Sequence, residues 1–423
     1  MRGLVLLGLL RQTSTAASPA DERACFDREL AEEGDAAARR GRARDGVLDV
    51  LGARISVDCS IAVRPGNATL ELRDFQGVSS YLDLRSPRPS RQPLLCELVQ
   101  HGAARFDGEA ALALLTSVGD AEYLWRYWRW MLNKHCWAAL TRTPYYLWVG
   151  FPLQKRRTAP IPPELGAASC PAALEETLGH TTKALSLHAM MVMRKARRIA
   201  FFDADAWFSR QAFQQLQPHF LRRFVTSSRG AIVALPAPCY KQFFGAAVMV
   251  TKTSPWALGF TRRWYLLRCG PKDQPSLWHL VLRASGRRAD ADDVLAAYHD
   301  ARCVDEAGSL TTKTCDARQC LNREDCGYFS AWASSTRIFK TLWQNGTRET
   351  PQLHEVRTTL RTPGGRIAYL PNSGVASNPL LCGDKPPVTH VKFLRKNDRD
   401  LDPRCPALPK AVSFSPGQGE ARP

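Results

Sequence analysis

Hydrophobic and polar positions follow two different patterns along the chain of 423 residues. Residues 21–47 are charged and Ala-rich, which predicts a helix or stem with little core of its own. Apolar and polar residues then alternate over 54–57 and 68–72, which predicts two strands of a small β-rich unit filling residues 21–107 together with the stem. From residue 108 to 397, apolar runs alternate with helical stretches, which predicts a larger α/β domain.

Short apolar runs mark the buried strands of this larger domain. Strands are predicted over 110–117, 145–150, 198–202, 231–235 and 246–250, and helices over 123–140 and 183–195. The Pro-rich segment 86–93 breaks regular structure and predicts a linker before the domain. Residues 398–423 are also Pro-rich, and we expect this tail to be disordered. The predicted fold class is α/β, a mixed sheet flanked by helices with a small N-terminal β-rich appendage.

Two carboxylates, Asp203 and Asp205, directly follow the apolar run over 198–202. They therefore stand at the carboxyl end of a predicted strand, where open α/β sheets bind ligands. A hard cation such as Mg²⁺ or Mn²⁺ prefers carboxylate oxygen from one or two side chains and completes its shell with substrate phosphate and water. The position and spacing of the two carboxylates therefore predict a site for a divalent cation.

The segment around these carboxylates resembles a known family. Residues 201–208, Phe-Phe-Asp-Ala-Asp-Ala-Trp-Phe, are similar to the Asp-x-Asp strand end of GT-A glycosyltransferases, especially the group of yeast-type α-galactosyl- and mannosyltransferases and plant xyloglucan xylosyltransferases. Other segments that resemble this group follow in its order: 133–138, 183–187, 254–257, 272–278 and 388–393. The resemblance spans roughly residues 108–397 and implies a GT-A (Rossmann-like) sheet.

The resemblance also implies roles for individual residues. Asp205 and His390 would bind Mn²⁺ (or Mg²⁺) together with the donor diphosphate, and Asp203 would contact the ribose or the metal through water. Lys183 would face the nucleotide, and Lys392 would offset the charge of the leaving diphosphate.

Asp273 and Gln274 would orient the sugar hydroxyls or the acceptor, according to the same resemblance. It further implies a nucleoside diphosphate sugar as donor, UDP-linked galactose or xylose, a glycan or glycoprotein acceptor, and retention of anomeric configuration. The chain departs from the group in two places. Residues 244–249 replace a turn that usually holds Asn and Gly, and Val391 and Lys392 follow His390 where the group often shows Gly and Lys.

Each candidate residue also has a structural alternative. His390 alternates with apolar residues, as an ordinary core or surface histidine does. Asp273 stands just before Pro275 and would serve equally as a helix cap. Lys183 and Lys392 would otherwise be ordinary solvated lysines. The aromatic residues of the region indicate core positions rather than sugar platforms: Trp256, Trp264 and Trp278.

Cysteine usage indicates an oxidising compartment, because the chain has 13 cysteines. Four of them lie close together: Cys303, Cys315, Cys320 and Cys326. They lack the His spacing that zinc prefers, which predicts a disulfide-bearing loop rather than a metal knuckle. The odd count leaves at least one thiol free or paired between chains. The glycosylation sequons at Asn67 and Asn345 agree with lumenal exposure.

Residues 1–20 place one arginine, Arg2, before a short apolar run, and mostly small residues follow that run, the layout of a secretory signal peptide or short signal anchor. The alternative is an apolar start with no targeting role. The run is too short to span a bilayer. We therefore expect the protein in the secretory pathway, in the Golgi lumen, at the Golgi membrane or secreted. At the membrane, it would be attached through its N-terminus.

The net charge of +18 changes this interpretation little, because Lys and Arg are scattered along the chain. A nucleic acid partner, which clustered basic residues would indicate, is not expected. The predicted function is a metal-dependent glycosyltransferase. The alternative is a catalytically inactive lumenal carbohydrate-binding protein of the same fold, which the altered turn over 244–249 favours.

Overall fold

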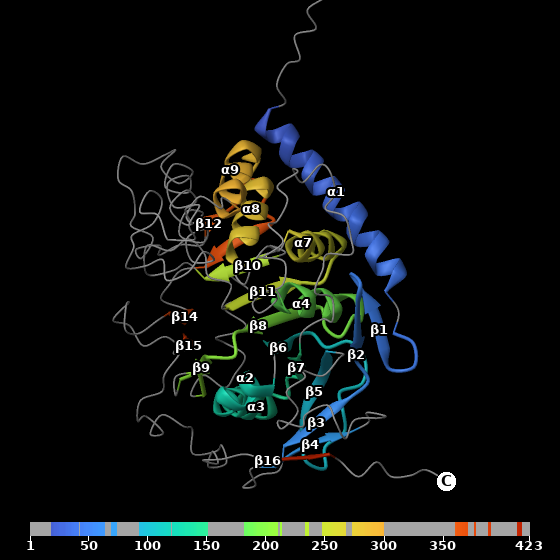
Figure 1. The fold of residues 1–423 in the computed structure, drawn as a ribbon. Helices are drawn as coiled ribbons and strands as arrows, with labels where there is room; N and C mark the ends of the chain where they lie inside the picture. Colours follow the sequence, from blue (N-terminus) through green and yellow to red (C-terminus); the bar gives the residue numbers. More distant parts are fainter. Residues whose placement is uncertain are drawn as a thin grey trace, which may run out of the picture.

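The structure is a computed structural model (Figure 1). It describes residues 18–41, 43–63, 69–73, 93–119, 121–150, 182–209, 212–213, 233–236, 248–267, 273–299, 360–370, 376–377, 388–390 and 413–416. Several sequence predictions lie wholly or mostly outside the described residues: the signal segment over 1–20 up to residue 17, the linker over 86–93 up to residue 92, the turn over 244–249 up to residue 247, the cluster Cys303, Cys315, Cys320 and Cys326, the sequons Asn67 and Asn345, and Lys392.

The described strands form two sheets. The larger is 13-stranded, with the order β12-β13-β10-β11-β8-β6-β7-β5-β3-β4-β16, and β1 joins it through β2, which pairs with β5. Its strands are β1 Val47–Val50, β2 Ala53–Ser56, β3 Ser60–Val63, β4 Thr69–Arg73, β5 Leu94–Gln100, β6 Ala113–Val118, β7 Tyr145–Val149, β8 Arg198–Phe202, β10 Val233–Pro236, β11 Val248–Lys252, β12 Leu360–Arg361, β13 Ile367–Leu370 and β16 Ser413–Pro416. The smaller sheet has the order β14-β15-β9, from β14 Ala376–Ser377, β15 Val388–His390 and β9 Ala206–Phe208.

The larger sheet is mixed. β6 pairs in parallel with both β7 and β8, whereas β11 pairs antiparallel with β8, and β5 antiparallel with β7. Strands predicted over 110–117, 145–150, 198–202, 231–235 and 246–250 are present as β6, β7, β8, β10 and β11. The predicted fold class, a mixed α/β sheet flanked by helices, is confirmed.

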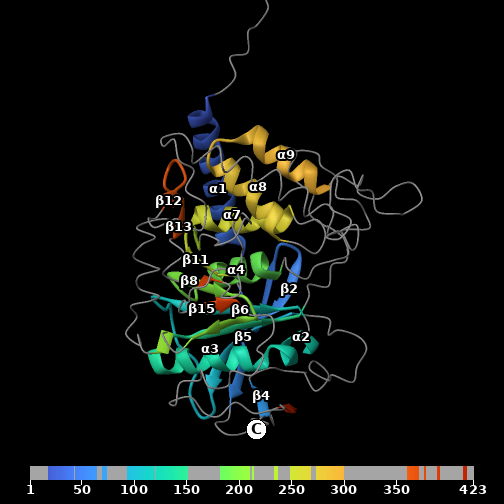
Figure 2. The same cartoon turned by 90° about the vertical axis from the view of Figure 1, so that its left-hand side faces the viewer.

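Helices cover both faces of the sheet, because side chains of its central strands alternate between two cores. In β8, Ile199 and Phe201 enter one core, and Ala200 and Phe202 enter the other. Figure 2 shows α4, α7 and α8 on one side and α3 on the opposite side. The helices are α1 Pro19–Arg40, α2 Ala121–Arg126, α3 Trp128–Thr141, α4 Thr182–Val192, α7 Pro255–Leu266, α8 Gln274–Ala284 and α9 Arg288–His299. Within the described residues, no helix combines the length and apolar character needed to cross a membrane.

Helix α1 differs from the predicted stem. The helix is present, but it packs on the α/β core through the buried residues Phe26, Leu30 and Gly34. Its contact with α7 is very close: a Cβ placed on Gly34 would lie 1.7 Å from the carbonyl oxygen of Pro255, and a Cβ on Gly259 would lie 2.0 Å from that of Leu30. Two glycines therefore let the two helix backbones touch, a role that the charged, Ala-rich pattern did not reveal.

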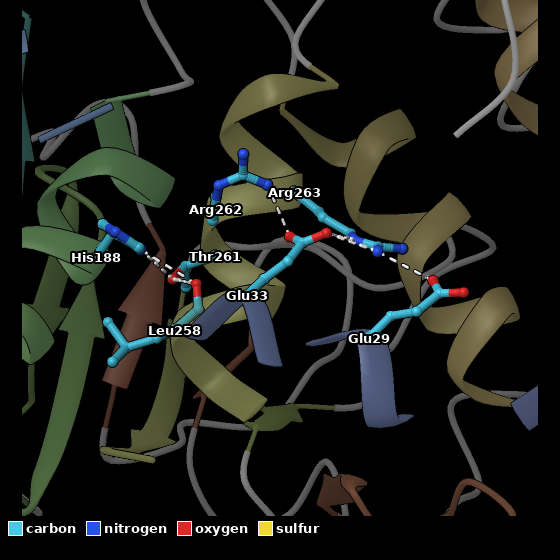
Figure 3. Close-up of polar contacts among 7 residues, drawn as sticks. All are labelled: Glu29, Glu33, His188, Leu258, Thr261, Arg262 and Arg263. Atoms are coloured by element: carbon cyan, nitrogen blue, oxygen red, sulfur yellow. Dashed lines mark hydrogen bonds and ion pairs between the residues drawn. The ribbon is translucent and has the colours of Figure 1, made fainter. Parts of the chain in front are cut away.

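An ion-pair cluster closes the same helix contact (Figure 3). The Arg263 guanidinium on α7, with 1% of its side chain exposed, donates to Glu33 Oε1 at 2.7 Å and to Glu29 Oε2 at 3.0 Å on α1. Arg262 donates to the second oxygen of Glu33 at 2.7 Å. Burial alone would lower the pKa of Arg263, but the two glutamates outweigh burial and raise it. The buried charge is therefore paired with two carboxylates, as a buried ion requires, while its Nη1 makes no hydrogen bond to any described residue.

The predicted boundary at residue 107 does not separate two sheets. β5 is hydrogen-bonded to β7, and β3 is hydrogen-bonded to β5, so strands from before residue 107 continue the same sheet. Six of the seven residues of β5 are buried, and five of these six are apolar, as expected of a central strand. The sequence analysis predicted no strand over 94–100, and so placed a boundary between two units where the sheet is continuous.

The tail prediction needs a second correction. Within the segment 398–423, residues 413–416 form β16, which pairs in parallel with β4. Because β4 would otherwise expose a row of unpaired backbone groups on that side, a short extended segment gains hydrogen bonds by adding to it. The Pro-rich composition of the tail did not indicate this strand.

A disulfide links Cys59 to Cys96, which confirms that the chain uses disulfides. It joins the start of β3 to β5, away from the predicted cluster at 303–326. Cys136 on α3 is also disulfide-bonded. Cys25 on α1 is an exposed free thiol, and its Sγ lies 3.3 Å from Glu29 Oε1.

The Gly34 contact predicts that Gly→Ala at this helix position destabilises the protein, the opposite of its usual effect. In an open helix, Gly→Ala stabilises by about 0.5–1 kcal/mol. Here Gly34→Ala should instead lower the free energy of unfolding by about 1–3 kcal/mol, because the methyl group forces α1 away from α7. Urea unfolding measures this, with the neighbouring exposed Asp35→Ala, expected within about 0.5 kcal/mol of wild type, as control. A stabilising Gly34→Ala would show that α1 does not dock as described.

Candidate functional site

The two carboxylates predicted at the strand end lie in a tight turn between β8 and β9. The turn is closed by a hydrogen bond of 3.0 Å from the Ala206 amide to the Asp203 carbonyl. Asp203 is partly exposed, whereas Asp205 has 4% of its surface exposed. The local sequence explains the turn, because the buried run of β8 ends at Phe202 and a new strand begins three residues after Asp203.

Helix α3 holds the turn and the strand that follows it. The Lys134 ammonium is buried and donates to three carbonyl oxygens, those of Asp203 at 3.2 Å, Ala204 at 3.1 Å and Ala206 at 2.8 Å. The neighbouring Asn133 makes two hydrogen bonds with the backbone of Phe208 in β9, of 3.1 Å and 2.8 Å. The backbone of the turn is thus fixed from below by one helix.

Lys183 on α4 connects the turn to a third carboxylate. Its Nζ lies 2.9 Å from Asp203 Oδ1 and 3.2 Å from Asp273 Oδ2. The exposed side-chain fractions are 6% for Lys183, 18% for Asp203 and 0% for Asp273. Lys183 is therefore not the solvated lysine of the structural alternative, and residues 70 positions apart in the sequence meet through one ammonium group.

The pKa values of the two buried lysines shift in opposite directions. Burial lowers the pKa of Lys134 to about 7, and the carboxylates of Asp205 and Asp203 only partly oppose this. Burial would likewise lower the pKa of Lys183, but its contacts with Asp203 and Asp273 outweigh burial and raise the pKa. Lys183 thus stays charged at neutral pH and shares its charge between two carboxylates.

Asp273 and Gln274 begin helix α8. Asp273 occupies the N-cap position, but its side chain makes no capping hydrogen bond and contacts Lys183 instead. Its carbonyl oxygen accepts a hydrogen bond of 2.9 Å from the indole of Trp264 on α7, which fixes where the helix starts. Within the described part of the chain, Gln274 Oε1 is buried and accepts no hydrogen bond. The described residues thus leave the acceptor capacity of this amide oxygen unused.

The backbone of His390 also lies at the turn. β15 pairs antiparallel with β9, and this register sets His390 opposite Ala206, the residue after Asp205. Of the residues predicted from the sequence, the structure thus brings together Asp203, Lys183 and Asp273 by side-chain contact, with Gln274 adjacent and His390 placed by its strand. Lys392 lies outside the described residues, and its role stays a prediction.

The donor atoms at the turn suit a hard divalent cation. Carboxylate oxygens are the ligands that Mg²⁺ and Mn²⁺ prefer, and such ions commonly use only one or two of them. Among the residues that the structure describes, no three His, Cys, Asp or Glu side chains are grouped to hold an ion. An ion at Asp205 would need further ligands from substrate phosphate and water, and the metal site stays a prediction.

Sequence reasoning missed two residues of this site. Lys134 was noted only as part of the segment 133–138, and nothing in its spacing predicts that its ammonium lies under the turn. Tyr123 on α2 is the second, because burial and the charges of Asp205 and Asp203 raise the pKa of its phenol. The three tryptophans assigned to the core are indeed buried: Trp256, Trp264 and Trp278.

Comparisons with known proteins add little to this picture. No protein-family model and no curated protein sequence matches the chain. Among solved structures, the chain is similar to a glycosyltransferase involved in the glycosylation of the major capsid of PBCV-1. The sequence identity is 11% and the TM-score 0.28, over 40% of this chain and 74% of that chain. A likeness at this level carries no argument about function, which has to come from the site.

The Lys183 contacts predict coupling between two buried charges. Lys183→Met should lower the free energy of unfolding by about 3–5 kcal/mol, because it leaves the buried Asp273 carboxylate without its partner. Adding Asp273→Asn should recover more than about 1 kcal/mol of this loss. Urea unfolding of the single and double variants tests the coupling. The exposed Lys252→Met provides the control, expected within about 0.5 kcal/mol of wild type. Strictly additive losses would contradict the contact.

Proposed function

We propose that the chain is a metal-dependent glycosyltransferase. It transfers a sugar from a nucleoside diphosphate sugar, UDP-linked galactose or xylose, to a hydroxyl of a glycan or glycoprotein, with retention of anomeric configuration. The observation that carries the proposal is the turn after β8, where two carboxylates and a buried lysine meet at the carboxyl end of a parallel strand pair. Open α/β sheets bind ligands at this place.

The reaction exchanges one bond at the anomeric carbon for another. The bond from this carbon to the diphosphate oxygen breaks, and its electron pair leaves with the diphosphate. The acceptor hydroxyl oxygen forms the new bond, and its proton passes to the departing diphosphate. The protein therefore has to place the donor, stabilise the negative charge that develops, and exclude water.

Each residue of the site fits one of these tasks. Asp205 and His390 would hold Mn²⁺ or Mg²⁺, which when bound would neutralise charge on the diphosphate. Asp203, oriented by Lys183, would contact the ribose or reach the ion through water. Lys392 would meet the phosphates. These roles rest on residue chemistry and on the resemblance described above.

Asp273 and Gln274 were both expected to orient the sugar or the acceptor, and the structure suggests different roles for them. Because Asp273 is fully buried against Lys183, it would act by positioning that lysine rather than by touching the sugar. Gln274 begins the same helix and carries the buried amide oxygen without a donor, so it would accept a hydrogen bond from a sugar hydroxyl. The structure thus supports Gln274 as the sugar contact.

The setting proposed for this activity is the lumen or membrane of the secretory pathway, in particular the Golgi. The disulfide between Cys59 and Cys96 supports an oxidising compartment, because such bonds persist there. A nucleic acid is not among the proposed partners, which are the nucleotide-sugar donor and the glycan or glycoprotein acceptor.

Donor hydrolysis tests the proposal most simply. The purified chain, incubated with a panel of nucleotide sugars and Mn²⁺, should release nucleoside diphosphate from one of them. Asp205→Asn, which keeps the shape but not the charge, should lower this rate about 100-fold or more. The exposed Asp35→Asn is the matched control and should keep the wild-type rate. Release from no donor would favour the catalytically inactive carbohydrate-binding alternative.

A further inference from the structure

Lys134 is a buried ammonium whose hydrogen bonds all go to backbone. The three acceptors are the carbonyl oxygens of Asp203, Ala204 and Ala206, so all three belong to the turn of the site. An ammonium group has three N–H donors and no acceptor, and these three contacts use all of them. The arrangement therefore matches the donor set of a charged lysine one to one.

These carbonyls need such a partner because of where they lie. Ala204 and Ala206 have 4% and 0% of their surface exposed, so water does not solvate their backbone from that side. The Asp203 carbonyl also accepts the Ala206 amide, and Ala206 belongs to the β9–β15 ladder, whereas the contact described for the Ala204 carbonyl is the one from Lys134. Removing the ammonium would take a donor from all three carbonyls of the buried turn and so weaken its hold on one conformation.

We propose that Lys134 is a positioning residue of this site: by fixing the backbone of the turn Asp203–Ala206, it sets the directions in which the Asp203 and Asp205 side chains point. The part that concerns nucleotide binding rests on the proposed function, whereas the part that concerns the turn does not. The adjacent Asn133 has a different task, because its two hydrogen bonds go to Phe208 in strand β9, beyond the turn.

The experiment compares backbone protection in the turn with nucleotide affinity. Lys134→Met keeps the length and apolar stem of the side chain but removes the three donors. Amide hydrogen exchange of the full chain is followed in peptides covering 203–208, with β7 peptides as an internal reference for the core. Lys252→Met makes the same chemical change at an exposed position of β11 and is the matched control. UDP binding in the presence of Mn²⁺ is measured on the same proteins.

We expect amide exchange over 203–208 to become about tenfold faster or more in Lys134→Met. Without the three hydrogen bonds from Lys134, local opening of the turn costs less free energy. Exchange in β7 and in Lys252→Met should match wild type. UDP affinity in Mn²⁺ should also fall about tenfold in Lys134→Met and stay unchanged in Lys252→Met. A folded Lys134→Met with wild-type exchange over 203–208 would overturn the proposal.

The remaining outcomes separate this inference from the proposed function. If wild type binds no UDP, the proposed function fails, while faster exchange over 203–208 still supports the role of Lys134 in the turn. If exchange rises but UDP affinity does not change, positioning of the carboxylates is overturned. If Lys134→Met does not fold, Lys134→Gln, which retains two N–H donors, should fold. Its amide exchange over 203–208 should be faster than in wild type but slower than in a turn without these hydrogen bonds. Failure of both variants to fold would contradict a local role.

Discussion

Two lysine ammonium groups lie buried beneath the turn that joins β8 to β9, and a buried charge costs several kcal/mol unless it is paired and hydrogen-bonded. The turn supplies hydrogen-bond acceptors to one lysine and a charge partner to the other. Its carbonyl oxygens accept from Lys134, and the Asp203 carboxylate pairs with Lys183. In return, the lysines hold the turn in one shape. This mutual dependence fixes the position of the two carboxylates at the end of a central strand, and the candidate site follows from it.

The helices around the sheet keep these lysines in place. Lys183 also needs Asp273, and Trp264 of α7 fixes the backbone where Asp273 begins α8. The residue before Trp264, Arg263, is held by two glutamates of α1. Helix α1 is therefore part of the support for the helices that position the candidate site, not a separate stem. A chain that lacked α1 would expose a buried arginine and the apolar side of α7.

Much of the α/β core could be predicted from the sequence. The strands β6, β7 and β8 are short buried runs that end in polar or glycine residues, and the position of Asp203 and Asp205 after β8 follows directly from that pattern. The register of β15 beside β9, which brings the backbone of His390 to the turn, agrees with the residues chosen from the family resemblance. The direct contacts of Lys183 with Asp203 and Asp273 also join residues chosen in this way.

The rest depends on contacts that no local pattern reports. Gly34 matters because of a helix backbone that lies more than 200 residues away in the sequence, and β16 forms because β4 offers an unpaired edge. β5 was missed because its nearly continuous apolar run follows a proline-rich segment that reads as a linker. Lys134 lies on a helix whose sequence pattern predicts only a core element, and only the folded chain shows that its ammonium contacts the turn. Tertiary packing decides each of these cases.

Titration of UDP into the wild-type chain by calorimetry, once with Mn²⁺ and once with EDTA, tests the central claim most directly. If the turn after β8 is a metal-dependent nucleotide site, UDP should bind in Mn²⁺ with an affinity at least about tenfold higher than in EDTA, because the ion links the carboxylates to the diphosphate. Equal affinity in both conditions, or no binding in either, would contradict the account.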